Sequence, residues 1–187
     1  MTKLAALLAL AFAVPALAAP ESFTLDHRHS FPSFRINHLG ISMQLGRFDK
    51  TTGKFTIDRA EHTGSVELTI DTASIDMGFD KWNEAMRDED WFNVAQYPTM
   101  SFKSTALVFN GDDVAGADGE FTLLGVTRPV SVKLSSFNCI VHPMNKKTVC
   151  GGTATTTIKR SEFGMKKALP GIGDEVEITM SVEAFKD

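Results

Sequence analysis

The feature that most constrains this chain is an alternation of apolar and polar residues that recurs along much of its length. In the clearest run, single polar residues separate Val176, Ile178, Met180 and Val182. A period of two is typical of strands with one face buried and the other solvated. The same alternation recurs in residues 33–37, 66–71 and 130–134. The pattern predicts strands that share one interior.

Further strand-like runs, at residues 43–57, 99–109, 114–124 and 149–159, bring the expected total to about eight strands. Turn residues separate them, as at Asn110-Gly111 and Pro170-Gly171. Short antiparallel strands at this spacing predict an all-β barrel or sandwich. One segment differs, because Trp82, Ala85 and Met86 recur at helical spacing. We expect one short helix there, between Asp80 and Asn93, covering an opening of the barrel.

The first 18 residues have the pattern of an export signal. Lys3 precedes an apolar run at residues 4–14, followed by Pro15 and small residues. We expect cleavage just before or just after Ala19, so that residues 19–187 form a single periplasmic domain. The apolar run is too short to span a bilayer, and no other stretch approaches the roughly 20 apolar residues required. No stable membrane span is expected.

The two cysteines, Cys139 and Cys150, lie in the part expected to be exported, where disulfides persist. We predict one disulfide between them. Alternatively, both could bind a metal with His142, although structural zinc sites use four ligands. The formal net charge is −4, and the basic residues are scattered among acidic ones. This distribution does not favour nucleic acid as a partner.

A polar cluster at residues 25–30 holds Asp26, His27 and His29. It predicts a hydrogen-bonded corner, a contact for a ligand head group, or a metal site at the two histidines. His38 is either a satisfied interior histidine or a residue that faces a ligand. The common motifs of nucleophilic, phosphate-binding and zinc-dependent enzymes do not occur. We therefore expect neither catalysis nor a cofactor, with a small enzyme or metal protein using His27, His29 and His142 as the alternative.

The interior should be rich in phenylalanine, because the chain has 14 Phe but only 1 Tyr and 2 Trp. Phenylalanine has no polar group to satisfy when buried, so such an interior suits a ligand without hydrogen-bonding groups along most of its length. The candidate lining residues are Phe34, Ile36, Met43, Phe48, Phe55, Leu68, Ile70, Phe102 and Phe121. An eight-stranded barrel can also be filled by its own side chains. Composition alone favours that packed core, which would suit a stress-linked interaction protein.

A series of short motifs follows in order along residues 26–176. They are Asp26 with His29-Ser30, residues 37–40, 46–48, 68–76, 90–94, 97–98, 102–104, 125–130, 160–165 and 173–176. Together they resemble the YceI-like family of periplasmic polyisoprenoid-binding proteins, which have a lipocalin-like shape. Trp91 departs from the family pattern, which usually has Phe there, and residues 81–86 lack the usual polar pattern. These departures concern the ligand and not the fold.

This resemblance implies an eight-stranded antiparallel lipocalin-like barrel with a tunnel for a polyprenyl chain, an isoprenoid quinone tail or a fatty amide. Residues 139–151 resemble a disulfide-bearing branch of the family. The expected function is therefore periplasmic binding or transport of a long-chain apolar lipid. Asp26, His29 and His38 are the candidates for its polar end. The lipid is the expected partner, and a homodimer is left open.

Overall fold

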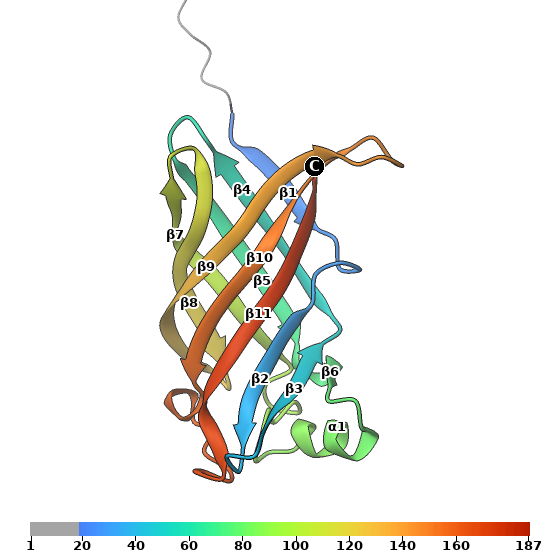
Figure 1. Cartoon of the computed structure of the whole chain (residues 1–187), viewed down its shortest axis with the longest axis vertical. Helices are drawn as coiled ribbons and strands as arrows, with labels where there is room; N and C mark the ends of the chain where they lie inside the picture. Colours follow the sequence, from blue (N-terminus) through green and yellow to red (C-terminus); the bar gives the residue numbers. More distant parts are fainter. Residues whose placement is uncertain (1–18) are drawn as a thin grey trace, which may run out of the picture.

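The computed structural model describes residues 19–187, which fold into one β-rich body (Figure 1). The predicted export signal at residues 1–18 lies outside the described residues. Within the described part, no helix is long and apolar enough to cross a bilayer.

Eleven strands, one α-helix and two 3-10 helices make up the described chain. The strands are β1 (Glu21–Leu25), β2 (Pro32–His38), β3 (Ser42–Phe48), β4 (Thr51–Asp58), β5 (Thr63–Asp71), β6 (Ile75–Asp76), β7 (Thr99–Asn110), β8 (Asp113–Leu123), β9 (Val126–Val141), β10 (Thr148–Lys159) and β11 (Ile172–Lys186). The helices are η1 (Thr72–Ser74), α1 (Asp80–Arg87) and η2 (Arg160–Phe163).

The strands close into an antiparallel barrel of eight wall segments. Three of the segments consist of two consecutive strands each, namely β1 with β2, β3 with β4, and β5 with β6. The order around the barrel then continues through β7, β8, β9, β10 and β11. β11 closes the ring by pairing with β1 along its last residues and with β2 along its first. The predicted eight-stranded antiparallel barrel is confirmed.

The corner between β1 and β2 is built by the polar cluster that the sequence singled out. Ser30 is fully buried, and its hydroxyl donates to the carbonyl of Glu183 and accepts from the N–H of the same residue, at 3.1 and 3.0 Å. The N–H of Asp26 also donates to the Glu183 carbonyl, at 2.8 Å. These bonds take the place of strand-to-strand hydrogen bonds at the point along β11 where its neighbour changes from β2 to β1. The cluster therefore shapes the wall.

The barrel wall is lined by inward side chains that are only half-buried. On β9, Val130, Val132 and Leu134 face the interior, while the polar residues between them are exposed. A side chain that points inward in a filled barrel would be fully covered by its neighbours. The incomplete burial of these residues shows that the barrel is hollow behind them.

One end of the barrel is closed by tightly packed side chains. The rings of Phe23 and Phe55 stack with their centroids 4.7 Å apart, and Phe137 packs edge-on against Phe55 at 6.2 Å. The predicted disulfide joins Cys139 to Cys150, which face each other across β9 and β10 beside this stack. The alternative in which these cysteines bind a metal with His142 is wrong, because both sulfur atoms are in the disulfide.

The helix lies at the opposite end of the barrel (Figure 1). It spans Asp80–Arg87 and so occupies only the first part of the segment between Asp80 and Asn93. Three acidic residues, Asp88, Glu89 and Asp90, follow Arg87, and negative charge at a helix C-terminus opposes the helix dipole. The chain continues as turns in which Trp91 donates from its N–H to the Asp88 carbonyl, at 3.1 Å.

Candidate functional site: two adjoining cavities in the barrel

The barrel interior holds two cavities, an entrance cavity of about 280 Å³ at the helix end and an inner cavity of about 150 Å³ toward the closed end. Five residues from five different strands line both cavities: Pro32, Ile70, Phe121, Ile158 and Ile178. The cavities therefore adjoin at this ring. Their combined size falls within the roughly 300–1,000 Å³ typical of small-molecule sites.

The inner cavity is apolar on every side. Its walls include Leu107, Val132 and Val182, and no polar group contributes surface to it. Phe55 and Phe137 line it toward the closed end. A polar group that moved from water into this cavity would lose its hydrogen bonds to water and find no new partner, which costs free energy. The inner cavity can therefore accommodate hydrocarbon and little else.

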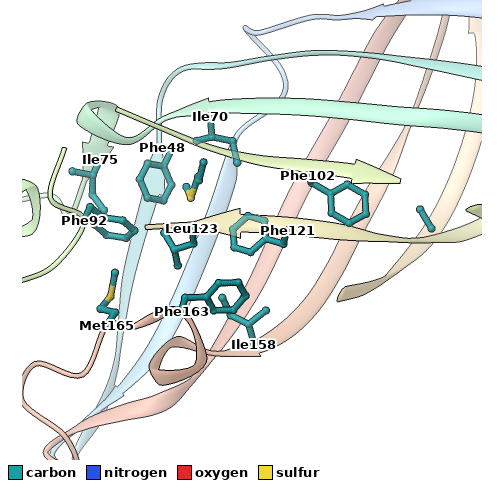
Figure 2. Packing of buried hydrophobic residues seen from close by; sticks show 12 residues of the cluster. Phe48, Ile70, Ile75, Phe92, Phe102, Phe121, Leu123, Ile158, Phe163 and Met165 are labelled. Carbon is teal, nitrogen blue, oxygen red and sulfur yellow. The ribbon is translucent and has the colours of Figure 1, made fainter. Parts of the chain in front are cut away.

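The entrance cavity is also mostly apolar, but it carries a few polar side chains. Aromatic rings from the helix and the loop after it, those of Trp82, Trp91 and Phe92, form part of its wall. Figure 2 shows Phe48 and Phe92 close together, and their rings meet edge-on at 5.2 Å. The polar residues that line the cavity are Ser33, His38, Gln44 and Arg160. A few polar groups on an apolar wall are typical of sites that fix the orientation of a ligand.

Arg160 is the most unusual of these polar residues, because it is almost completely buried. Its exposed fraction is 1 %. The guanidinium donates from Nε to the carbonyl of Gly173 at 2.8 Å, from Nη1 to that of Met165 at 3.0 Å, and from Nη2 to that of Ile172 at 2.9 Å. These bonds use three of the five N–H groups of an arginine. Arg160 thus fixes the loop beside the entrance cavity.

Asp174 and the Trp91 ring lie near the Arg160 guanidinium. Burial lowers the pKa of Arg160, and the nearby Asp174 carboxylate partly offsets this effect. Burial also opposes ionisation of Asp174, but the N–H and hydroxyl of Ser161 donate to its carboxylate at 2.9 and 2.8 Å and hold its pKa below the usual range. The Trp91 ring lies 5.6 Å from the guanidinium carbon, within the range of a cation–π contact. The cavity wall therefore carries one positive group next to an aromatic ring.

Most of the lining residues expected from the sequence do line the cavities. Those at the entrance cavity are Phe34, Ile36, His38, Phe48, Ile70 and Phe121. Those at the inner cavity are Phe55, Leu68, Ile70, Phe102 and Phe121. Figure 2 shows Phe102 and Phe121 projecting from the neighbouring strands β7 and β8.

Three candidates lie elsewhere, and for them the expected position in the site is corrected. Met43 is 41 % exposed on β3 and lines neither cavity. It pairs directly with Asn37, which alternates with the inward-facing Ile36, so Met43 points outward. Asp26 and His29 also lie outside both cavities, in the corner between β1 and β2.

The Asp26 carboxylate is engaged within that corner. Arg28 donates to it from Nε at 3.0 Å, and Nδ1 of His29 lies 2.9 Å from its other oxygen. The hydrogen bonds from Arg28 hold the pKa of Asp26 well below its usual range, against the effect of burial, and His29 contributes in the same direction. Within residues 19–187, no three side chains of His, Cys, Asp or Glu come together as a metal site.

The structure also adds residues that the sequence analysis did not select for the site. Arg160 entered the sequence analysis only within the motif at residues 160–165, and no local pattern reveals its burial because its carbonyl partners lie 5 to 13 residues away. Trp82 and Met86, by contrast, had a usable signal. They occupy the apolar face of the predicted helix that was expected to cover an opening.

Comparison with known proteins shows which sequences and structures this chain resembles. Residues 23–184 match the model of the YceI-like domain. The chain is 36 % identical over 179 residues to a UPF0312 protein of Pseudomonas aeruginosa, covering 95 % of this chain and 93 % of that protein. It is 34 % identical over 172 residues to Protein YceI of Escherichia coli, covering 91 % and 89 %.

Solved structures share the fold. BcnA of Burkholderia cenocepacia superposes with a TM-score of 0.70 at 26 % identity, covering 85 % of this chain and 98 % of that one. A polyisoprenoid binding domain from Saccharophagus degradans gives a TM-score of 0.66 at 19 % identity, with coverage of 88 % and 98 %. The extent of the domain match and the identity to the Pseudomonas aeruginosa and Escherichia coli proteins show that the chain belongs to the YceI-like family.

Proposed function

We propose that the barrel binds a long-chain apolar lipid and carries it through the periplasm without changing it chemically. The observation that carries this proposal is the pair of adjoining cavities, whose inner part offers only hydrocarbon surface. A tail that fills such a cavity gains about 0.8 kcal/mol for each CH₂ removed from water. Ten buried carbons would contribute about 8 kcal/mol before the cost of ordering the ligand, which supports useful affinity without strong polar contacts.

The proposed orientation places the tail toward the closed end and the polar end of the lipid in the entrance cavity. Phe23 and Phe55 block the far end, so the tail stops there. The polar residues His38, Gln44 and Arg160 all lie on the entrance cavity. The proposed ligand is a polyisoprenoid, an isoprenoid quinone or a fatty amide. The name of the Saccharophagus degradans domain, a polyisoprenoid binding domain, and the fold that it shares with this chain support the first of these.

Mass spectrometry of an organic extract tests the proposal directly. The protein would be purified under native conditions from the periplasm of cells that express the full chain. We expect one class of long-chain lipid at close to one molecule per chain. If no lipid is recovered and added polyprenol or quinone does not bind, the carrier function is wrong.

A substitution at the ring between the cavities localises the binding. Ile178 is one of the five residues that line both cavities, so Ile178→Trp should block the passage between them. Bound lipid should then fall at least tenfold. The matched control is Ser181→Trp on the same strand, where the side chain is exposed. Equal lipid content in both variants would show that the lipid lies outside the barrel.

A further inference from the structure

We propose that the entrance end of the barrel docks on the surface of a lipid bilayer through a ring of exposed apolar side chains. This inference rests on the proposed carrier function and concerns where the lipid is exchanged. We define the apolar rim as Leu39, Ile41, Phe79, Trp82 and Leu169. Their exposed fractions are 60, 82, 52, 46 and 36 %.

The rim comes from three separate segments that meet at one end of the molecule. Leu39 and Ile41 lie in the turn between β2 and β3, Phe79 and Trp82 lie at the start of α1, and Leu169 lies in the loop before β11. Figure 1 shows all three segments at the end opposite the chain terminus marked C. The N–H of Leu39 donates to the carbonyl of Gly171 at 2.7 Å, which ties the turn to the loop.

The rim is continuous with the cavity. Trp82 belongs to both, because its side chain lines the entrance cavity and is also 46 % exposed. His38, next to Leu39, and Ile172, shortly after Leu169, line the same cavity. The exposed apolar surface therefore borders the opening through which a ligand would pass.

A bilayer is the occupant that this position favours. A tail that left the cavity into water would be disfavoured by roughly fourfold for each CH₂ exposed. Docking removes that barrier, because the tail moves from one apolar phase to another. Contiguous exposed apolar patches commonly mark protein or membrane contacts. A protein seated on the rim would cover the opening that the lipid needs.

The charges near the rim are mixed, so apolar insertion should dominate over electrostatic attraction. Lys166 and Lys167 precede Leu169, but Lys167 pairs with Asp90 at 2.6 Å. The helix carries Asp80 and Glu84, and also Lys81 and Arg87. We therefore expect binding to zwitterionic membranes with little dependence on salt.

Flotation of the full chain with phosphatidylcholine vesicles tests docking. We expect the protein to float with vesicles to a similar extent at low and high salt. The double variant Leu39→Ser with Ile41→Ser should reduce vesicle partitioning at least tenfold. The matched control is Ile140→Ser with Val141→Ser, two exposed apolar residues at the opposite end of the barrel that are 53 and 64 % exposed. The control should stay within twofold of the unaltered chain.

Several results would overturn docking. These are failure of the unaltered chain to float, an equal loss in both double variants, or binding that high salt or Lys166→Gln abolishes while the rim variant still floats. Sedimentation without vesicles tests a second copy of the chain as the occupant. A dimer that the rim substitutions dissociate, with no flotation, would assign the rim to self-association instead.

Lipid content, measured in the same samples, separates this inference from the carrier function. A rim variant that retains its lipid but transfers it to vesicles at least tenfold more slowly supports both proposals. Protein that floats but never contains or accepts lipid would contradict the carrier function and leave the rim as a membrane contact. Lipid-loaded protein that exchanges at an unchanged rate in the rim variant would contradict docking alone.

Discussion

The two ends of the barrel use the same alternating strands but place different contents inside them. At the closed end, Phe23 and Ala184 are 1 and 0 % exposed, and a stack of phenylalanine rings fills the space. At the entrance end, the walls stand apart around a cavity of about 280 Å³ that carries the buried charge of Arg160. One end therefore depends on packing for its stability, whereas the other leaves room for a ligand.

The connections between strands differ in the same way. The hairpin between β9 and β10, near the closed end, is cross-linked by the disulfide. The loop before β11, at the entrance, is held by hydrogen bonds from one arginine, which reach one carbonyl in the loop and two at the start of β11. The comparison teaches that substitutions at the closed end should change the free energy of unfolding, and substitutions in the cavities should change ligand binding.

The largest expected effect is that of Phe23→Ala at the closed end. Removing this buried ring leaves a cavity in a well-packed cluster, which should lower the free energy of unfolding by about 3–5 kcal/mol. Denaturant titration measures the change. The folded variant should still bind lipid, because Phe23 lines neither cavity. Loss of lipid from folded protein would break the proposed division between the two ends.

Removal of the disulfide should have the next largest effect. Cys139→Ser with Cys150→Ser frees a short loop and should lower the free energy of unfolding by about 3 kcal/mol. Reduction of the unaltered chain should lower its thermal midpoint similarly, which serves as the control. Lipid content should not change. A loss of lipid that exceeds the loss of folded protein would show that the closed end also shapes the binding site.

The corner between the two ends gives a pH-dependent prediction. An aspartate in an unfolded chain has a pKa of about 3.9, and the pKa of Asp26 in the folded protein is lower. The stability that the ionised Asp26 carboxylate contributes is therefore fully present above about pH 4. It is lost as the pH falls toward the pKa of Asp26 in the folded protein. Asp26→Asn should destabilise the protein by about 2 kcal/mol at neutral pH and progressively less under acid.

Denaturant titrations between about pH 7 and pH 2 would follow this difference. Asp49→Asn is the control, since Asp49 forms an exposed ion pair with Arg47 at 2.8 Å and such pairs contribute little. A constant destabilisation by Asp26→Asn at every pH would show that the carboxylate charge is not what holds the corner.

The smallest expected effect concerns ligand length. Ala154→Phe adds a ring inside the inner cavity, which Ala154 lines. Lipids with long tails should bind about tenfold more weakly, which is a loss of about 1.4 kcal/mol of binding free energy. The reason is that the added ring occupies the space that the end of the tail would fill. Short-tailed lipids, which stay in the entrance cavity, should bind as before.

Ala106→Phe provides the matched control, because Ala106 is exposed on β7. Titrations with a series of prenols of increasing length would measure both variants. Equal weakening for all tail lengths would show that the inner cavity does not hold the tail. That result would contradict the proposed orientation.

Much of the fold could be predicted because its signals are local. Alternation identified the inward residues of several strands, and most of the predicted lining residues do line a cavity. Met43 was the avoidable error. Met43 and Phe48 lie five positions apart on one strand, so a period of two cannot direct both of them inward.

Arg160 and the corner residues could not be assigned in this way. The carbonyl partners of Arg160 are Met165 in the loop before β11 and the first two residues of β11, and Ser30 bonds to Glu183, which lies 153 residues away. The partners of Arg160 come together when β10 and β11 pair, whereas Ser30 meets Glu183 only when the barrel closes. A polar residue in a motif can therefore be structural or can line the site, and sequence spacing does not distinguish the two.

The sequence by itself determined an all-β barrel or sandwich, with one short helix and a disulfide between two cysteines, and the resemblance to the YceI-like family implied the antiparallel barrel. Those features depend on side-chain period, turn residues and short spacings. Only the tertiary structure decided that the centre holds cavities, that one end is filled, and that Arg160 lies in the wall. The volume left inside a barrel depends on how the inward side chains from all its strands pack against one another. No single segment of the sequence therefore predicts that volume.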